Sequence, residues 1–416
     1  MKTQNRFDVT IILPIRNDEQ LLKPLLMAIN NQTFLPEKIV IVDSSTNDTS
    51  KDIVAKYDDT VPIVYHRVKK AYPGKARNIG VNLSKSEWVA FLDSKTIPEK
   101  DWLERYHHLL QTYNTDMVFG VTQFNATLPF QKIFRAATYG DIGHHTVPGT
   151  IIKKKVFTDS GGFLEHVRMG EDIEWRERLI KNDLNIHLPN EPAVTYHGLP
   201  DSLISTLKKY VKSAYHTARL KILRNVKDAY LSLLLILSAI ILPKWNHLIG
   251  GWDTNPLFIP HITKIYLMAS VILLLTYQLV HYLFFRNISQ TVFSRTLRMI
   301  ALFFITLTVY RWNAVIAGWM EDAVLYIPHI TKIYLGGLIM TSIFYRGLLL
   351  PLRRHVEPAY LFPLRWIRVG LLGLTLDLIK APGYVIGALL GGFLGLLRKS
   401  KSNSILFFVY CYIYFC

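Results

Sequence analysis

The sequence predicts an α/β domain of about 200 residues followed by an all-α membrane region. Up to about residue 200, short apolar runs alternate with amphipathic segments, which indicates parallel strands joined by crossover helices. Beyond residue 229 long apolar runs dominate, and these are typical of membrane-spanning helices. Carboxylates follow two of the short runs, at Asp43 and Asp93. Because an open α/β sheet binds ligands outside the carboxyl ends of its strands, we expect the functional site at that edge.

The charge and the cysteines narrow the classes of function. The net charge is +17, but the basic residues lie in a stretch over 201–228 and between the apolar segments. This placement favours anionic lipid and phosphate-bearing substrates over nucleic acid as partners. Cys411 and Cys416 are the only cysteines, so the sequence offers no disulfide framework and no thiolate metal site.

Strands and helices are expected to alternate through the first 92 residues. Strands are predicted at 9–13, 38–42, 62–66 and 88–92, and helices at 19–30, 49–57 and 74–83. In the first helix, apolar residues recur on one face, and the polar turn Asp43–Asp48 is suited to cap the second helix. This order predicts a mostly parallel, Rossmann-like sheet.

Six motifs lie at the ends of these elements or just beyond them. They are Ile11–Glu19, Asn31–Thr33, Ile41–Ser45, Gly74–Gly80, Phe91–Pro98 and Gly170–Asp172. In this order and at these spacings they resemble the family 2 glycosyltransferases. The resemblance covers roughly residues 8–200. It implies the GT-A fold and an inverting transferase that depends on a nucleotide-sugar donor.

The resemblance also implies which residues hold the donor. Those implied for the nucleoside are Pro14, Asp18 or Glu19, and Asp43. A carboxylate there can accept hydrogen bonds from ribose hydroxyls or a base N–H. Lys75 and Arg77 are cationic and stand beside two glycines, so they are suited to approach a diphosphate closely. The structural alternatives are a helix cap for Asp43 and a solvated helix start for Lys75 and Arg77.

The chain departs from the family pattern at Lys95. The family's metal motif is Asp-x-Asp, whose carboxylates carry Mg²⁺ or Mn²⁺ against the donor diphosphate, whereas this chain has Asp93-Ser94-Lys95. Three outcomes remain open: metal binding by Asp93 with another ligand, metal-independent catalysis with the Lys95 ammonium as the cation, or loss of activity. His197 is the candidate second ligand, although a lone histidine is more often structural.

The resemblance places the catalytic base at Asp172. Inversion needs a base that takes the proton of the attacking acceptor hydroxyl, and a carboxylate at a helix start can serve. Glu171 is expected to position the acceptor, and Trp175 is a further acceptor-binding candidate. The alternative is that Glu171 and Asp172 form a plain capping pair.

Residues 201–228 are predicted to form a basic amphipathic helix between the domain and the membrane region. One side carries apolar residues and the rest carries seven lysines and arginines, each worth about 1 kcal/mol against anionic lipid. The Gln-x-x-Arg-Trp motif of sugar-polymerising relatives is absent, because Arg311-Trp312 and Arg365-Trp366 lack the glutamine. A single transfer is therefore preferred over processive synthesis.

The membrane region contains an internal repeat. The nine residues 259–267 recur without change at 327–335, which predicts two tandem two-helix units over 229–350. Arginines between the units place those loops, and the N-terminal domain with them, in the cytoplasm by the positive-inside rule. No secretory leader is evident at the start of the sequence. Residues 366–397 are expected to form one kinked span or two interfacial helices, within a further segment over 351–416.

These patterns together predict a multi-pass protein of the cell membrane. It is expected to move one sugar from a nucleotide-sugar donor to a lipid-linked or other membrane-presented glycan acceptor in surface-glycan synthesis. The acceptor rests on membrane attachment and family analogy. Two alternatives stay open: a processive polysaccharide synthase, and a catalytically degenerate membrane protein that binds without turnover.

Overall fold

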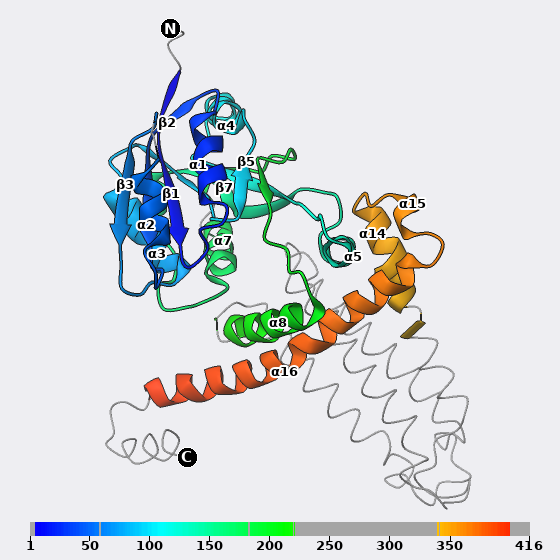
Figure 1. Cartoon of the computed structure of the whole chain (residues 1–416). Helices are drawn as coiled ribbons and strands as arrows, with labels where there is room; N and C mark the ends of the chain where they lie inside the picture. The colour runs from blue at the N-terminus through cyan, green and yellow to red at the C-terminus, as the bar shows by residue number, and fades with distance from the viewer. Residues whose placement is uncertain are drawn as a thin grey trace, which may run out of the picture. The chain divides into compact units, whose positions relative to one another are not determined.

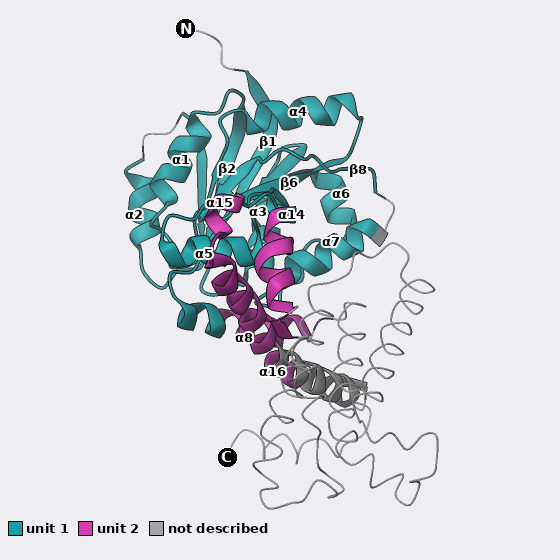
Figure 2. Ribbon diagram, turned by 90° about the vertical axis from the view of Figure 1, so that its right-hand side faces the viewer, with its two compact units in different colours: residues 1–208, 353–356 teal, residues 209–352, 357–416 magenta. Residues whose placement is uncertain are grey.

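The computed structural model describes residues 5–57, 60–181, 184–218, 220, 339–340 and 342–399. The chain divides into two compact units (Figure 2). Unit 1 comprises residues 1–208 with 353–356, and unit 2 comprises residues 209–352 with 357–416. The predicted repeat at 259–267 and 327–335, with most of the predicted spans, lies outside the described residues.

Unit 1 is built on a nine-stranded sheet (Figure 1). The strands are β1 (Arg6–Ile15), β2 (Leu35–Asp43), β3 (Ile63–Arg67), β4 (Trp88–Phe91), β5 (Thr96–Pro98), β6 (Met117–Phe124), β7 (His144–Lys153), β8 (Ile186–His187) and β9 (Val194–Tyr196). Their order is β3-β2-β1-β4-β7-β6-β9-β5, with β8 paired to β6. The four strands predicted from the sequence are therefore neighbours in the sheet.

The sheet is mixed: most of its strand pairs are parallel, as expected, and three are antiparallel. Strands β3, β2, β1 and β4 are parallel, as their alternation with helices predicts. Strand β7 runs antiparallel to both β4 and β6, and β5 runs antiparallel to β9. The connection from β6 to β7 carries only the short helix α5 (Pro129–Thr138), and it returns the chain at the end of the sheet where β6 finishes. A strand that enters in this way runs antiparallel to its neighbour.

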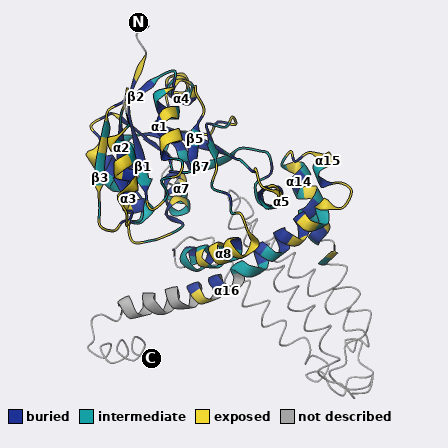
Figure 3. Ribbon diagram, in the orientation of Figure 1, coloured by how far each residue is buried: buried dark blue, intermediate teal, exposed yellow. Residues whose placement is uncertain are grey.

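Two hydrophobic clusters cover opposite faces of the sheet. Along β1, Ile11 and Leu13 belong to one cluster and Ile12 belongs to the other, as the two-residue period of a strand requires. The first cluster contains α1 (Leu22–Asn30) and α4 (Trp102–Thr112), and the second contains α3 (Pro73–Leu83) and α7 (Glu171–Lys181). The remaining helices of the N-terminal part are α2 (Thr49–Ala55), α6 (Lys154–Asp159) and α8 (Leu203–Ala218). Figure 3 shows the central strands β1 and β2 as largely buried, whereas the edge strand β3 is intermediate to exposed.

The described part of unit 2 is helical. Its elements are the π-helix η2 (Tyr345–Leu349), α14 (Leu350–Arg353), α15 (Pro358–Leu361) and α16 (Arg365–Lys399). Of the two alternatives expected over 366–397, the structure shows one continuous helix, α16 of 35 residues, and not two helices. In the first part of α16, the buried Asp377 pairs with Arg346 and Lys380. None of the helices that the structure describes combines the length and the apolar character needed to cross a membrane.

Candidate active site

The candidate site residues come from the carboxyl ends of β1, β2 and β4 and from the start of α7. Asp18 follows β1, Asp43 ends β2, Asp93 follows β4, and Asp172 is the second residue of α7. The first three elements are neighbours in the parallel part of the sheet, so their carboxyl ends meet at one edge. Pro14 lies inside β1 opposite Val42, at the same edge.

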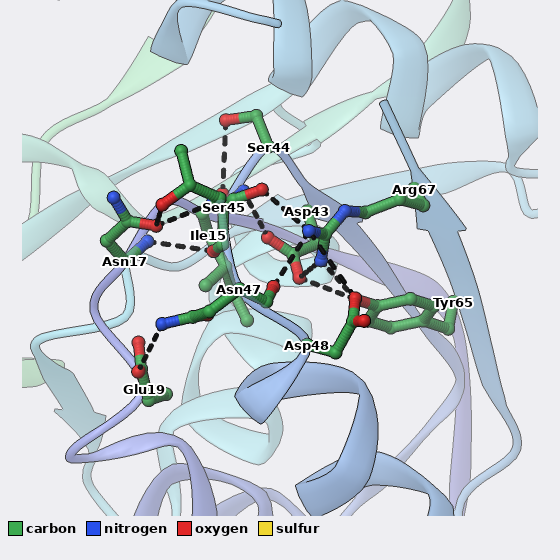
Figure 4. Close-up of polar contacts among 11 residues, drawn as sticks. Ile15, Asn17, Glu19, Asp43, Ser44, Ser45, Asn47, Asp48, Tyr65 and Arg67 are labelled. Carbon is green, nitrogen blue, oxygen red and sulfur yellow. Dashed lines mark hydrogen bonds and ion pairs between the residues drawn. The ribbon is translucent and has the colours of Figure 1, made fainter. Parts of the chain in front are cut away.

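Asp43 is completely buried, and both of its carboxylate oxygens are occupied (Figure 4). Oδ2 accepts the Tyr65 hydroxyl at 2.5 Å and Arg67 Nη1 at 2.9 Å, while Oδ1 accepts the Ser45 N–H at 2.7 Å. Burial and the neighbouring carboxylate raise the pKa of Tyr65 to about 12. The helix-cap alternative for Asp43 is not what the structure shows, since its partners lie in the turn and on β3.

The polar turn after β2 is fastened to the loop after β1. Arg67 Nη2 donates to the carbonyls of Ser45 and Asn47, both at 2.7 Å. Asn17, whose φ is 50°, donates its N–H to Ser45 Oγ and accepts the Thr46 N–H on its side-chain oxygen. Glu19 accepts from Asn47 Nδ2 at 3.3 Å. Asp43 and Glu19 thus help to hold the two loops that the resemblance assigns to the nucleoside.

Arg77 is buried and joins two carboxylates from different elements. Its Nη2 contacts Asp93 Oδ1 at 2.7 Å and its Nη1 contacts Glu171 Oε1 at 2.9 Å. The guanidinium also lies over the Phe163 ring, 5.3 Å from the ring centroid. The carboxylates of Asp93 and Glu171 hold the pKa of Arg77 above its ordinary value against the opposing effect of burial. This arginine therefore faces carboxylates, whereas Lys75 on the same helix is exposed.

The glycines of α3 serve packing. A Cβ at Gly74 would lie 2.3 Å from the Leu164 carbonyl oxygen, and one at Gly80 would lie 2.4 Å from Ile12 Cγ2. Both distances are too short for a real side chain, so the backbone of α3 needs glycine to approach β1 and the loop before α7. Lys75 and Arg77 beside these glycines stay predicted donor-binding residues.

Lys95 lies beside Asp18. Its Nζ is 3.4 Å from Asp18 Oδ1, and Ser94 Oγ donates to Asp18 Oδ2 at 2.9 Å. The turn that carries these residues is fixed at both ends: Thr96 N donates to the Asp93 carbonyl at 2.9 Å, and His197 N donates to the Lys95 carbonyl at 2.8 Å. The structure thus brings the loop after β1 to the position where the family pattern has its metal motif.

Asp172 is solvent-exposed at the start of α7, and its neighbour Glu171 is buried. Although Asp172 is exposed, the protein atoms packed around it raise the pKa of its carboxyl through partial desolvation, and the charge of Arg77 opposes this. Burial likewise raises the pKa of Glu171, again against Arg77. An exposed carboxylate with a raised pKa is suited to accept a proton from an incoming hydroxyl.

Two of the predicted acceptor residues lie away from the surface. Trp175 is fully buried and packs against Phe163, with a centroid distance of 4.6 Å, and against Phe91 at 6.0 Å. It is a core residue on the inner face of α7, so its ring offers no surface to an acceptor. Glu171 is engaged with Arg77, below the exposed Asp172.

The residues around Asp93 do not fit the divalent cation that the resemblance implies. Asp93 Oδ1 is bonded to Arg77, and an ammonium stands where the motif has its second carboxylate. His197 is exposed, and its Nδ1 contacts Asn125 Nδ2 at 3.1 Å. Within the described ranges, no three histidine, cysteine or acidic side chains gather in a way that could hold a metal ion.

Sequence reasoning missed Tyr65, Arg67 and a second group of residues around Tyr139. The first pair carried a usable signal, because residues two apart on a strand share a face and β3 neighbours β2, with Arg67 opposite Asp43. Tyr139 stacks on Phe124 at a centroid distance of 3.6 Å, and Phe124 meets Tyr196 at 5.5 Å. Burial raises the pKa of Tyr139 to about 12, the charge of Arg354 opposes this, and the charge of Asp172 adds to it.

Comparison with known proteins identifies the family of the N-terminal domain. Residues 10–161 match the model of the glycosyl transferase family 2. Glycosyltransferase AglE of Haloferax volcanii is 26% identical over 185 residues, 41% of this chain and 60% of the relative. The pre-mycofactocin glycosyltransferase of Mycobacterium tuberculosis is 26% identical over 191 residues, 42% of this chain and 39% of the relative. The chain thus spans less than two thirds of the length of these relatives.

Among solved structures, residues 1–349 of Staphylococcus aureus TarS in complex with UDP-GlcNAc give a TM-score of 0.41 at 17% identity, covering 85% of this chain and 93% of that one. A mannosyltransferase from Pyrobaculum calidifontis in complex with GDP-Man and Mn²⁺ gives a TM-score of 0.39 at 18% identity, covering 51% and 62%. The predicted resemblance is confirmed by the family match over the strands that carry the site. Residues 10–161 therefore match glycosyl transferase family 2, within an N-terminal domain of α/β fold.

Proposed function

We propose that the whole protein is an inverting glycosyltransferase that moves a single sugar from a nucleotide-sugar donor to a membrane-presented glycan acceptor. The observation that carries the proposal is the exposed Asp172 at the start of α7, tied through Glu171 and Arg77 to Asp93 at the end of β4. This chain of contacts links the predicted base to the predicted donor site. A transferase needs such a link, because the base must act at the anomeric carbon of the bound donor.

The reaction follows from these placements. The acceptor oxygen attacks the anomeric carbon and its proton passes to the Asp172 carboxylate. The bond between that carbon and the phosphate oxygen breaks, and the nucleoside diphosphate leaves with the electron pair. Because attack and departure occur on opposite faces of the sugar, the anomeric configuration inverts. The loops fastened around Asp43 and Asn17 are proposed to hold the nucleoside.

Membrane attachment and a glycan acceptor complete the proposal. The long apolar runs beyond residue 229 and the basic stretch over 201–228 support a multi-pass membrane protein whose catalytic domain faces the cytoplasm. Among the relatives is a poly(ribitol-phosphate) β-glucosyltransferase of Bacillus spizizenii, 28% identical over 117 residues, 27% of this chain and 18% of the relative. This relative is named for poly(ribitol-phosphate), which supports a polymeric acceptor here.

The test is release of nucleoside diphosphate from a panel of nucleotide sugars by the purified full-length chain. Wild type is compared with Asp172→Asn and with Asp159→Asn, a control that changes an exposed carboxylate at the end of α6. We expect turnover of at least one donor by wild type and by the control, and its loss in Asp172→Asn. Binding of a donor without turnover, even with membrane glycolipid extract added as acceptor, would instead indicate a degenerate domain.

A further inference from the structure

The carboxylates at the end of β4 already have cationic partners. Asp18 pairs with Lys95, and Asp93 pairs with Arg77, which also pairs with Glu171. From these pairs we infer that the Lys95 ammonium, and not a divalent cation, neutralises the donor diphosphate, so that donor binding is independent of metal. The inference rests on the proposed function and deepens it.

The carboxylates are not free to form a cation site. A divalent ion takes several oxygen ligands, and its site depends on carboxylates whose charge is not already balanced. Asp93 gives Oδ1 to Arg77 at 2.7 Å, and the Arg77 side chain is only 5% exposed, so this guanidinium stays in place. Asp18 gives one oxygen to Lys95 and the other to Ser94. An incoming divalent cation would meet the buried Arg77 guanidinium and the Lys95 ammonium at this point.

The ammonium is held where a phosphate can reach it. The turn carrying Lys95 is fixed by the bonds of Thr96 and His197 to its backbone, so the lysine starts from a defined position. Its side chain is 41% exposed and that of Asp18 is 27% exposed. Exposed ion pairs of this kind contribute little to stability, so Lys95 can exchange the carboxylate for a phosphate at low cost. An ammonium binds phosphate as a point charge and makes no geometric demand, unlike a metal.

The surroundings of Lys95 are formed by the segment at the end of β9. Tyr196 ends β9 and lies opposite Thr96, which follows Lys95 in the chain. A Cβ added at Gly198 would lie 2.3 Å from Lys95 Cδ and 2.5 Å from the Tyr196 hydroxyl oxygen, so both side chains border the same small space. Because Lys95 contacts Asp18 and follows Asp93 by two residues, the three side chains come from the adjacent loops after β1 and β4.

The experiment measures binding of UDP, GDP and dTDP to the full-length chain by calorimetry, first in EDTA and then with Mn²⁺. We expect at least one diphosphate to bind in EDTA, with a Kd that Mn²⁺ changes by less than about 3-fold. Lys95→Met should weaken that diphosphate by about 10-fold or more, the loss of one charge-assisted contact, and leave the parent nucleoside unaffected. The control Lys85→Met removes an exposed lysine just before β4, at the other end of the strand, and should change nothing.

A second variant tests the same point from the other side. Lys95→Asp recreates the second carboxylate, and its diphosphate affinity should become dependent on Mn²⁺. The inference is overturned if wild type binds a diphosphate only with Mn²⁺, or if Lys95→Met binds as well as wild type. Either result leaves the proposed transferase intact. Failure of every diphosphate to bind, with and without Mn²⁺, would instead remove the proposed function together with the inference.

Discussion

Arg77 is the residue on which the geometry of the site depends. A buried guanidinium is stable only when carboxylates surround it, and here Asp93 and Glu171 supply them from the end of β4 and the start of α7. The position of each carboxylate is thereby fixed relative to the other. The sequence suggests this arginine for the diphosphate, and the structure shows that it joins Asp93 to Glu171.

Replacement of Arg77 should therefore change stability and pH dependence together. Arg77→Met leaves Glu171 buried and unpaired, which we expect to lower the free energy of unfolding in urea by about 3–5 kcal/mol. Since the charge of Arg77 lowers the pKa of Asp172, its loss should also move the acid limb of kcat/KM to higher pH. Arg168→Met, at an exposed position, should change the free energy of unfolding by less than about 0.5 kcal/mol. An unshifted acid limb in Arg77→Met would contradict the proposed coupling.

The proposed role of Asp172 as the base predicts how kcat/KM of the wild-type protein depends on pH. Asp172 must be deprotonated to accept a proton, so kcat/KM should fall as the pH drops through its pKa. Because desolvation raises that pKa, the midpoint of the acid limb should lie above 3.8, the ordinary value for aspartate. Asp172→Asn should lower kcat by about 10²–10⁴-fold with donor affinity retained. A midpoint at or below the ordinary value would argue that another group accepts the proton.

At the scale of elements, the sequence predicts what depends on neighbouring residues along the chain. The helix expected at 74–83 is observed as α3 over Pro73–Leu83, and the strand expected at 38–42 is the central part of β2, because apolar periodicity and turn residues are local signals. The antiparallel direction of β7 depends on the path of the connection between β6 and β7, and the apolar periodicity of the sequence does not encode that path. Trp175 is predicted as an acceptor-binding residue, but its side chain packs against Phe163 in the core, a tertiary contact that the local sequence does not reveal.

Helix α3 provides a test of how element packing supports the site. Gly80→Ala places a methyl group 2.4 Å from Ile12 Cγ2, so α3 must shift away from β1 and carry Arg77 with it. We expect a loss of about 1–3 kcal/mol in the free energy of unfolding, measured in urea, because overpacking forces such shifts. Asn82→Ala on the exposed side of the same helix should be neutral or slightly stabilising. Equal stability of the two variants would show that β1 and α3 can separate without cost.

At the scale of the whole molecule, unit 1 is not a continuous stretch of sequence. Residues 353–356 belong to it although nearly 150 residues separate them from Lys208 (Figure 2). Arg354 donates a side-chain hydrogen bond to the Thr138 carbonyl, and its own carbonyl accepts the Asp141 N–H at 2.8 Å. Gly140 lies between Thr138 and Asp141 in the sequence and has a φ of 71°. A Cβ at Gly140 would lie 2.3 Å from Arg354 Cβ. Through these contacts, residues 353–356 fix the turn that carries Tyr139. Burial raises the pKa of Tyr139, and the charge of Asp172 raises it further.

The segment should influence the acceptor side of the site, and Arg354→Ala tests this. Loss of a hydrogen bond from a charged donor should lower the free energy of unfolding by about 1.5–3 kcal/mol. Burial lowers the pKa of His144 most and the charge of Arg354 lowers it further, so in Arg354→Ala the His144 ring, followed by NMR titration, should protonate at higher pH than in wild type. Arg353→Ala removes the same charge type from an exposed neighbour and should move neither quantity. If both variants shift the pKa of His144 equally, that pKa reflects the net charge of the protein. Residues 353–356 then do not act on the turn that carries Tyr139 through Arg354.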